Sequence, residues 1–247
     1  MMSMRPLSSA PVVRGTVALL LAGALGCGLI SSDISKVTFE LPAKTYTFNS
    51  AQWGIPAGNT VAVHCGAPDN PVTMTVMDCC NPPAPFPKPN CTANPLVCEG
   101  TPKVCTLEQP VAVGQSVNLK SEVSVLSSIN SQSIADITLS NLHYEAQSTL
   151  NVDVPPLDLY IAADGVQDPK DPSAQKFGTV PAIPGGTSPS GDVVLEPNSD
   201  AVFSARGQMF GTPFNFIAAT TISVPSGSPT PTGMITVTIT GTVAAKL

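Results

Sequence analysis

The sequence has few charged residues, few aromatic residues and almost no histidine. Charged residues make up 11% and aromatic residues 5% of the 247 positions, and only two are histidine. Eleven basic residues stand against 17 acidic ones, which gives a formal net charge of −6. Nucleic-acid-binding proteins gather basic side chains on one surface to neutralise phosphates. This acidic chain with scattered lysines lacks that feature, and we expect no nucleic acid partner.

The motifs of common catalytic sites are also missing. The chain has no H-E-x-x-H and no phosphate-binding glycine loop, and residues 186–190 (G-T-S-P-S) resemble G-x-S-x-G without its closing glycine. His64 and His143 are each expected to be a polar residue on the exposed side of a strand, because nothing in the sequence supplies a nucleophile beside them. We therefore expect neither an enzyme nor a cofactor, and a hydrolase with an unrecognised site stays as an alternative.

Residues 1–26 have the layout of a secretory signal. Arg5 and Arg14 precede a charge-free run over residues 15–32, whose apolar centre lies at 17–21. The run contains A-L-G-C at residues 24–27, which resembles the lipobox of bacterial lipoproteins, where a small residue precedes an invariant cysteine. The resemblance implies that Cys27 receives a diacylglyceryl group and becomes the first residue after cleavage. Acyl chains such as palmitate then hold the protein on a bilayer, since each buried methylene contributes about 0.8 kcal/mol.

The lipobox interpretation divides the chain into a signal peptide (1–26), a lipid anchor and tether (27–34) and one folded domain (35–247). Removing residues 1–26, which hold two basic and no acidic residues, changes the net charge from −6 to −8. Gly28 stands where lipoproteins retained in the inner membrane of enteric bacteria typically have aspartate, so the resemblance favours the outer membrane. Two alternatives remain. Residues 22–24 (A-G-A) form an A-x-A-like site that would release a soluble protein, and the charge-free run of about 18 residues is long enough for an uncleaved anchor.

The number of cysteines agrees with a lipid on Cys27. The chain has seven cysteines, and an odd number cannot all pair in disulfides within one exported chain. With Cys27 acylated, six remain, and in an oxidising compartment they imply three disulfides with 15 possible pairings. Zinc would favour tight C-x-x-C pairs in a reducing compartment, so we favour disulfides. The six are Cys65, Cys79, Cys80, Cys91, Cys98 and Cys105.

Residues 65–105 are expected to form an insertion that disulfides hold together. Seven prolines fall within residues 81–102. Proline lacks the backbone N–H that helices and sheets use and favours an extended chain. The order in this segment must therefore come from its disulfides, which typically contribute about 2–4 kcal/mol each.

The rest of the domain shows the two-residue alternation of half-buried strands. Alternation predicts strands at 36–41, 45–49, 60–64, 72–77, 137–146, 150–154, 157–161, 193–195, 202–205, 214–224 and 235–243. A change of apolar parity near Ser140 and Asn141 predicts a β-bulge. Residues 111–135 are interpreted as a strand followed by a short helical turn, and residues 164–191 as a long loop. Many short strands between Pro- and Gly-rich turns predict an all-β antiparallel β-sandwich, which resembles immunoglobulin-like envelope modules.

One acidic cluster has the spacing of metal ligands. Asp164, Asp168 and Asp171 lie in a loop, and weak calcium sites occur on β-sandwich loops. Lys170 lies within the cluster and the spacing differs from the twelve-residue calcium loop, so we favour an ordinary solvated turn.

The sequence predicts a lipid-anchored cell-envelope protein with a non-catalytic structural or binding role. Its expected partners are the membrane, through the lipid, and an unidentified envelope protein or ligand. A carrier of an apolar ligand or lipid between envelope membranes is the alternative, and it would need a cavity of several hundred Å³.

Overall fold

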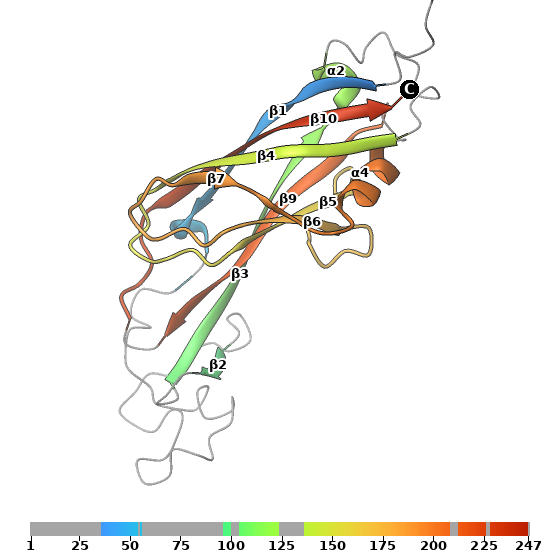
Figure 1. The fold of residues 1–247 in the computed structure, drawn as a ribbon. Helices are drawn as coiled ribbons and strands as arrows, with labels where there is room; N and C mark the ends of the chain where they lie inside the picture. Colours follow the sequence, from blue (N-terminus) through green and yellow to red (C-terminus); the bar gives the residue numbers. More distant parts are fainter. Residues whose placement is uncertain are drawn as a thin grey trace, which may run out of the picture. The chain divides into compact units, whose positions relative to one another are not determined.

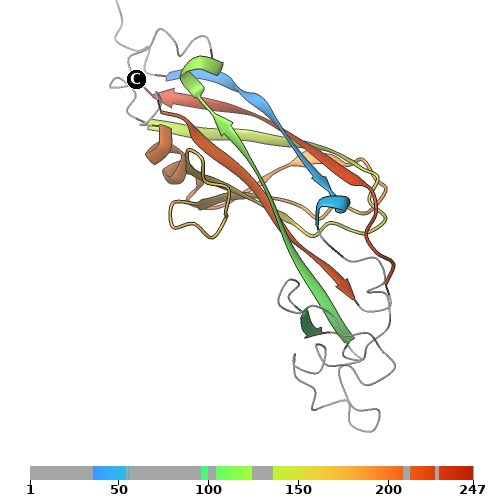
Figure 2. The same ribbon diagram turned by 180° about the vertical axis from the view of Figure 1, so that it is seen from behind.

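The computed structural model describes residues 36–53, 55, 96–99, 104–123, 136–207, 212–225 and 228–246. All of the described residues belong to one compact unit, which falls within residues 34–247. Its ribbon is drawn from opposite sides in Figures 1 and 2.

The fold is an antiparallel β-sandwich, as predicted. One sheet has the strand order β1-β10-β4-β7 and the other has the order β2-β3-β9-β5-β6-β8, and every strand pairing is antiparallel. The two layers are visible in Figure 1. The elements are β1 (Lys36–Asn49), η1 (Ser50–Gln52), β2 (Leu96–Glu99), β3 (Val104–Val117), α2 (Leu119–Glu122), β4 (Asp136–Ser148), β5 (Leu157–Ala163), β6 (Gln175–Val180), β7 (Ser190–Asp192), β8 (Val194–Leu195), α4 (Ser199–Gly207), β9 (Phe214–Pro225) and β10 (Met234–Lys246).

Alternating apolar residues place the core between the sheets. Leu157, Leu159 and Ile161 of β5 are at most 1% exposed, and Ile235 and Val237 of β10 are equally buried. Because successive side chains of a strand point to opposite faces, Thr236 and Thr238 of β10 lie on the outer face, where each contacts a threonine of β1. The alternation read from the sequence therefore gives the correct inner face for these strands.

Two bulges interrupt the four-stranded sheet at the same level. Pro42 and Ala43 of β1 lie together opposite Thr240, because the register runs from Leu41↔Gly241 to Lys44↔Ile239. In β4, Asn141 and Leu142 lie together opposite Gly241 in the same way. The predicted bulge in β4 is confirmed, and Asn141 within it has a positive φ of 54°. The two strands predicted at 36–41 and 45–49 form one strand instead, because the bulge accommodates Pro42 and β1 continues through it.

The strand and helical turn predicted from residue 111 onward are confirmed as β3 and α2. Asn118 begins the helix in the usual way, because its side-chain oxygen accepts a hydrogen bond from the Ser121 backbone N–H at 3.3 Å. The N–H of Asn118 in turn donates to Glu122 Oε1 at 2.8 Å. This reciprocal pair stabilises one turn of helix at the end of a long strand.

Three other sequence predictions are wrong. The strand expected at 150–154 does not form, and only Val154 makes an isolated β-bridge, with Ile183. The structure has helix α4 where a strand was expected at 202–205, since a segment of four residues, three of them apolar, fits either period. Within the segment expected to be one long loop, β6 pairs with β5, and the short β7 pairs with β4. Both strands are short, and they form because β5 and β4 provide antiparallel partners for them.

The two sides of the sandwich are closed differently. On one side the chain passes directly from β7 in the first sheet to β8 in the second at Val193, whose N–H donates to Leu142 O at 2.8 Å. On the other side β1 lies beside β3 and α2, as Figure 2 shows. Side chains rather than a backbone ladder join β1 to β3, including Gln115 Nε2, which donates to Thr45 O at 3.2 Å. We call this side the β1–β3 seam.

Only part of the predicted insertion is described. Residues 96–99 form β2, which pairs with the start of β3. The predicted strands at 60–64 and 72–77, and the predicted signal, anchor and tether, lie outside the described residues. Among the helices that the structure describes, none is long and apolar enough to cross a membrane.

Candidate functional site

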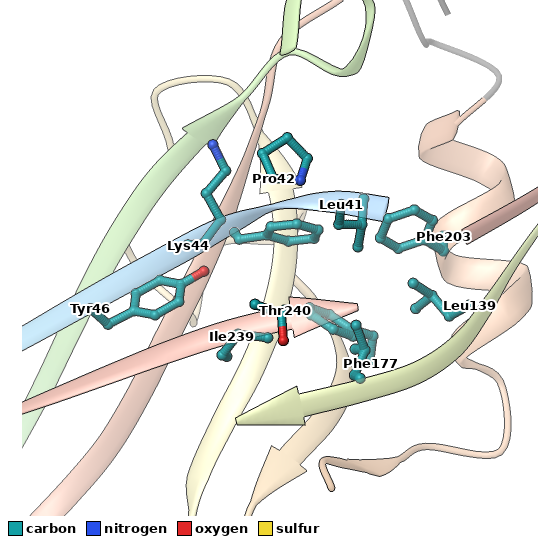
Figure 3. A pocket seen from close by; sticks show the side chains of 11 residues that line it. Leu41, Pro42, Lys44, Tyr46, Leu139, Phe177, Phe203, Ile239 and Thr240 are labelled. Carbon is teal, nitrogen blue, oxygen red and sulfur yellow. The ribbon is translucent and has the colours of Figure 1, made fainter. Parts of the chain in front are cut away.

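A small hollow lies between the sheets where the bulges occur. We call it the bulge pocket, and Figure 3 shows side chains from both sheets and from α4 converging on it. Its volume is about 20 Å³, which is the space of roughly one water molecule. It is lined by Leu41, Pro42, Lys44, Tyr46, Leu139, Leu142, Phe177, Phe203, Phe216, Ile239 and Thr240.

One wall of the bulge pocket is a cluster of phenylalanines. Phe177, Phe203 and Phe216 have ring centroids 5.4–6.4 Å apart, and Phe214 packs edge-on against Phe216 at 5.2 Å. Such edge-to-face and offset contacts are favourable for aromatic rings. The cluster brings together β6, α4 and β9, so the helix that the sequence did not predict supplies one side of this wall.

Three polar side chains, those of Tyr46, Lys44 and Thr240, also line the bulge pocket. Tyr46 is 2% exposed, and burial raises the pKa of its phenol. Lys44 is also largely buried, with 15% of its side chain exposed. The hollow is therefore apolar on the side of the phenylalanines and carries one cation at the seam.

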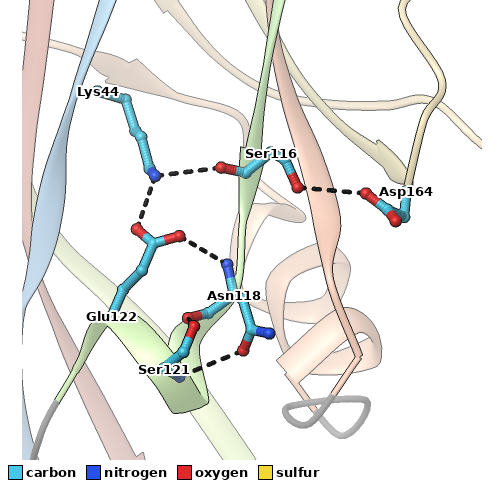
Figure 4. Close-up of polar contacts among 6 residues, drawn as sticks. All are labelled: Lys44, Ser116, Asn118, Ser121, Glu122 and Asp164. Carbon is cyan, nitrogen blue, oxygen red and sulfur yellow. Dashed lines mark hydrogen bonds and ion pairs between the residues drawn. The ribbon is translucent and has the colours of Figure 1, made fainter.

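A network of polar contacts holds Lys44 across the β1–β3 seam (Figure 4). Its Nζ lies 2.7 Å from Glu122 Oε2 and donates to Ser116 O at 3.2 Å. Ser116 Oγ donates to Asp164 Oδ1 at 3.2 Å, which extends the network to the loop after β5. The network links three chain segments that are far apart in sequence.

The same bulges form an open polar hollow on the outer side of the sheet. It has a volume of about 590 Å³, and its lining includes Glu40, Glu122, Asn141 and the Gly241 backbone. Bulges are common next to binding sites because they redirect side chains. Its two carboxylates would favour a hydroxyl or a cation over an anion.

A wider groove lies on the outer face of the six-stranded sheet, over β3, β9 and β5. Its volume is about 900 Å³, and Ala112 and Ala219 lie among its lining residues beside Pro110, Pro156 and Tyr160. Burial, and then the neighbouring Asp158 carboxylate, raise the pKa of Tyr160. The groove is mixed in character, because Asp158, Asp168 and Lys170 line it together with the prolines and the Tyr160 phenol.

Near this groove Lys176 bridges two carboxylates. Its Nζ lies 2.9 Å from Asp158 Oδ1 and 2.9 Å from Glu196 Oε1. The hydrogen bond to Asp158, followed by that to Glu196, raises the pKa of Lys176. The bridge connects β5, β6 and the chain that follows β8.

His143 lies on the outer face of the four-stranded sheet, as predicted for a polar strand residue. Its Nδ1 lies 3.2 Å from Asp192 Oδ1, and the two side chains are 44% and 89% exposed. Water screens such an exposed pair, so it contributes little to stability. His64 lies outside the described residues.

The three aspartates of the calcium candidate are not brought together. Asp164 accepts from Ser116, Asp168 Oδ1 accepts from the Lys170 N–H at 2.9 Å, and Asp171 Oδ1 accepts from the N–H and Oγ of Ser173. The Ser173 hydrogen bonds lower the pKa of Asp171. Across the described part of the chain, no group of three acidic, histidine or cysteine side chains could hold a metal ion.

Two of the predicted disulfide cysteines fall on described strands. Cys98 is in β2 and Cys105 is in β3, and the Cys105 side chain is 3% exposed. The others, Cys65, Cys79, Cys80 and Cys91, lie outside the described residues, as does Cys27.

No sequence pattern predicted the bulge pocket or the β1–β3 seam. Lys44 and Glu122 are 78 positions apart, so no local pattern connects them. The sequence did contain one indication of the pocket. Alternation is interrupted at Pro42 and at Asn141, and the pocket forms where the bulges at these two residues lie.

Comparisons with known proteins identify no family. No protein-family model matches the sequence, and no curated protein matches it. Among solved structures, Desmodium yellow mottle tymovirus is similar over 66% of this chain and 91% of its own, with 12% identity and a TM-score of 0.25. Turnip yellow mosaic virus matches 67% of this chain and 85% of its own, at 17% identity and a TM-score of 0.23. The nodavirus of the prawn Macrobrachium rosenbergii is similar over 96% of this chain and 95% of its own, with 11% identity and a TM-score of 0.22. These TM-scores are too low to support any conclusion about a shared fold or function.

Proposed function

We propose that the chain is a lipid-anchored protein of the bacterial cell envelope with a non-catalytic structural or binding role. The observation that carries the proposal is the charge-free run that ends in the lipobox-like A-L-G-C at Cys27. The odd number of cysteines supports it, because acylation of Cys27 leaves an even set for disulfides. The outer membrane is the favoured location.

The outer groove on the six-stranded sheet supports a binding role. It combines small residues with prolines and the Tyr160 ring over a rigid sheet. A protein segment that presents apolar side chains would bury surface against it.

The alternative function, a carrier of an apolar ligand, is favoured by the phenylalanines of the bulge pocket. An acyl chain needs several hundred Å³, whereas the pocket holds about 20 Å³. Loading would therefore require the sheets to separate at the β1–β3 seam. Extraction of the purified protein with organic solvent, followed by lipid analysis, tests this: a stoichiometric lipid supports a carrier, and its absence after exposure to membranes argues against one.

The decisive experiment for the anchor is intact mass analysis of the protein extracted from membranes. We expect the mature chain to begin at Cys27 with a diacylglyceryl adduct. A Cys27→Ser variant is the matched control and should lose the adduct and the membrane association together. A soluble mature chain that begins at Leu25 would contradict the anchor and support simple secretion, and an unprocessed chain in the membrane would support an uncleaved anchor.

A further inference from the structure

Cys98 and Cys105 lie opposite each other in the pairing of β2 with β3. The register joins Leu96 to Leu107, Val97 to Thr106 and Cys98 to Cys105. Opposite residues in an antiparallel pair have Cα atoms about 4.5–5.5 Å apart, and bridged cysteines have Cα atoms about 4.4–6.8 Å apart. The backbone pairing thus sets these two cysteines at the separation that a disulfide requires.

We propose that Cys98 and Cys105 form an intramolecular disulfide that fastens β2 to β3. The proposal rests on the export proposed above, because disulfides persist in oxidising compartments. Formation of the S–S bond removes two protons and two electrons from the two thiols. A disulfide donor of the thiol–disulfide oxidoreductase class accepts them and leaves as a dithiol.

The position of β2 gives the disulfide a structural purpose. This strand has only four residues and lies at the edge of its sheet, where β3 is its neighbour. A short two-stranded pairing is marginal in water without further support. The burial of Cys105 also protects its sulfur, since exchange requires access for an attacking thiolate.

The pairing simplifies the connectivity of the whole insertion. Six cysteines allow 15 pairings, but once Cys98 and Cys105 are joined the remaining four allow only three. The four are Cys65, Cys79, Cys80 and Cys91.

Peptide mapping of the unreduced full-length protein tests the proposal directly. Free thiols are first blocked, and the chain is then cleaved by trypsin after Lys103 and by chymotrypsin after Leu96 and Leu107. We expect a disulfide-linked pair of peptides, residues 97–103 and 104–107, that separates on reduction. Either cysteine linked to a different peptide, or both alkylated as free thiols, would overturn the proposal.

Thiol counting in variants provides an independent measurement. Among the six cysteines, C98S and C105S should each expose one thiol, and C98S/C105S should expose none. The matched control C91S/C105S should expose two, because it breaks two different pairs. Two thiols in C98S/C105S would overturn the proposal. The mass of the Cys27 peptide is scored separately, so a missing lipid adduct is distinguishable from a wrong disulfide.

Discussion

Lys44 in β1 and Glu122 in α2 form an ion pair of 2.7 Å that joins the edge of one sheet to the chain leaving the other. The two side chains are 15% and 28% exposed, so water screens the pair less than an open surface pair. Lys44 also contacts the Ser116 carbonyl, which fixes its position at the β1–β3 seam.

We expect Glu122→Gln to destabilise the fold, because it leaves the Lys44 ammonium half-satisfied in a largely buried position. The expected loss is about 1 kcal/mol in the free energy of unfolding by urea. Lys44→Met in the same background should restore part of this loss, which gives a positive coupling in a double-mutant cycle. Lys120→Met, at an exposed position of α2, is the control and should have little effect. Additive effects of the two seam substitutions would show that the pair does not contribute.

Gly241 is the position in β10 where a larger residue should be least tolerated. A Cβ atom there would collide with the side chain of Leu142, which is 3% exposed and packed in the core. We expect Gly241→Ala to lower stability by about 2 kcal/mol through overpacking. Thermal unfolding followed by circular dichroism measures the change. Leu142→Ala added to Gly241→Ala should cost less than the sum of the two single effects, and simple additivity would refute the collision.

Asn141 holds a left-handed backbone at the bulge of β4, with φ of 54°. Non-glycine residues in this region cost about 1–2 kcal/mol, although asparagine tolerates it better than most. Asn141→Gly should therefore be neutral or stabilising, and Asn141→Val should destabilise by about 1 kcal/mol or more. Gln147→Val on the same strand, also exposed, is the control and should be tolerated. Equal effects of valine at both positions would contradict the bulge geometry.

The Lys176 bridge predicts a dependence of stability on pH. Its hydrogen bonds to Asp158 and Glu196 raise the pKa of Lys176 above the ordinary value of 10.5. The stabilisation is therefore fully present below the ordinary pKa and is lost as the pH rises through the raised one. Because all three side chains are about a third exposed, we expect Lys176→Met to cost no more than about 1 kcal/mol at neutral pH. Urea unfolding should show that the difference from the parent protein shrinks as the pH rises above 10.5. A difference that grows with pH would contradict this.

Calcium should not stabilise the protein through the loop after β5. Asp164, Asp168 and Asp171 each accept hydrogen bonds from different groups, and they do not converge. We expect the melting temperature to be the same with millimolar calcium as with a chelator. A rise with calcium that Asp168→Asn abolishes would show that the loop rearranges into a site.

The sandwich could be predicted because its strands alternate strongly and face a single core. In β10 and β5 the apolar period of two decides the inner face without help from distant residues. The parity change at Asn141 revealed a bulge for the same reason. The interruption of alternation at Pro42 predicts two strands where there is one, because only the pairing with β10 shows that the strand continues through the proline.

The missed elements depend on contacts between distant segments. Val202 and Phe203 are both buried, but only their packing beside β4 and β6 distinguishes helix α4 from a strand. The strands β6 and β7 exist because β5 and β4 offer them partners. The Lys44–Glu122 pair requires β1 and α2 to meet, which no local sequence pattern encodes.

The bulges on both sides of β10 also determine how this strand aligns with its neighbours. A slide of β10 by two residues would keep its apolar side chains facing inward, so alternation alone does not forbid it. That slide would place Ile239 or Val243, both with branched side chains, opposite the bulge of β4, where Leu142 leaves room only for the glycine now present. The glycine at position 241 thus disfavours shifted alignments that the hydrophobic pattern alone would permit.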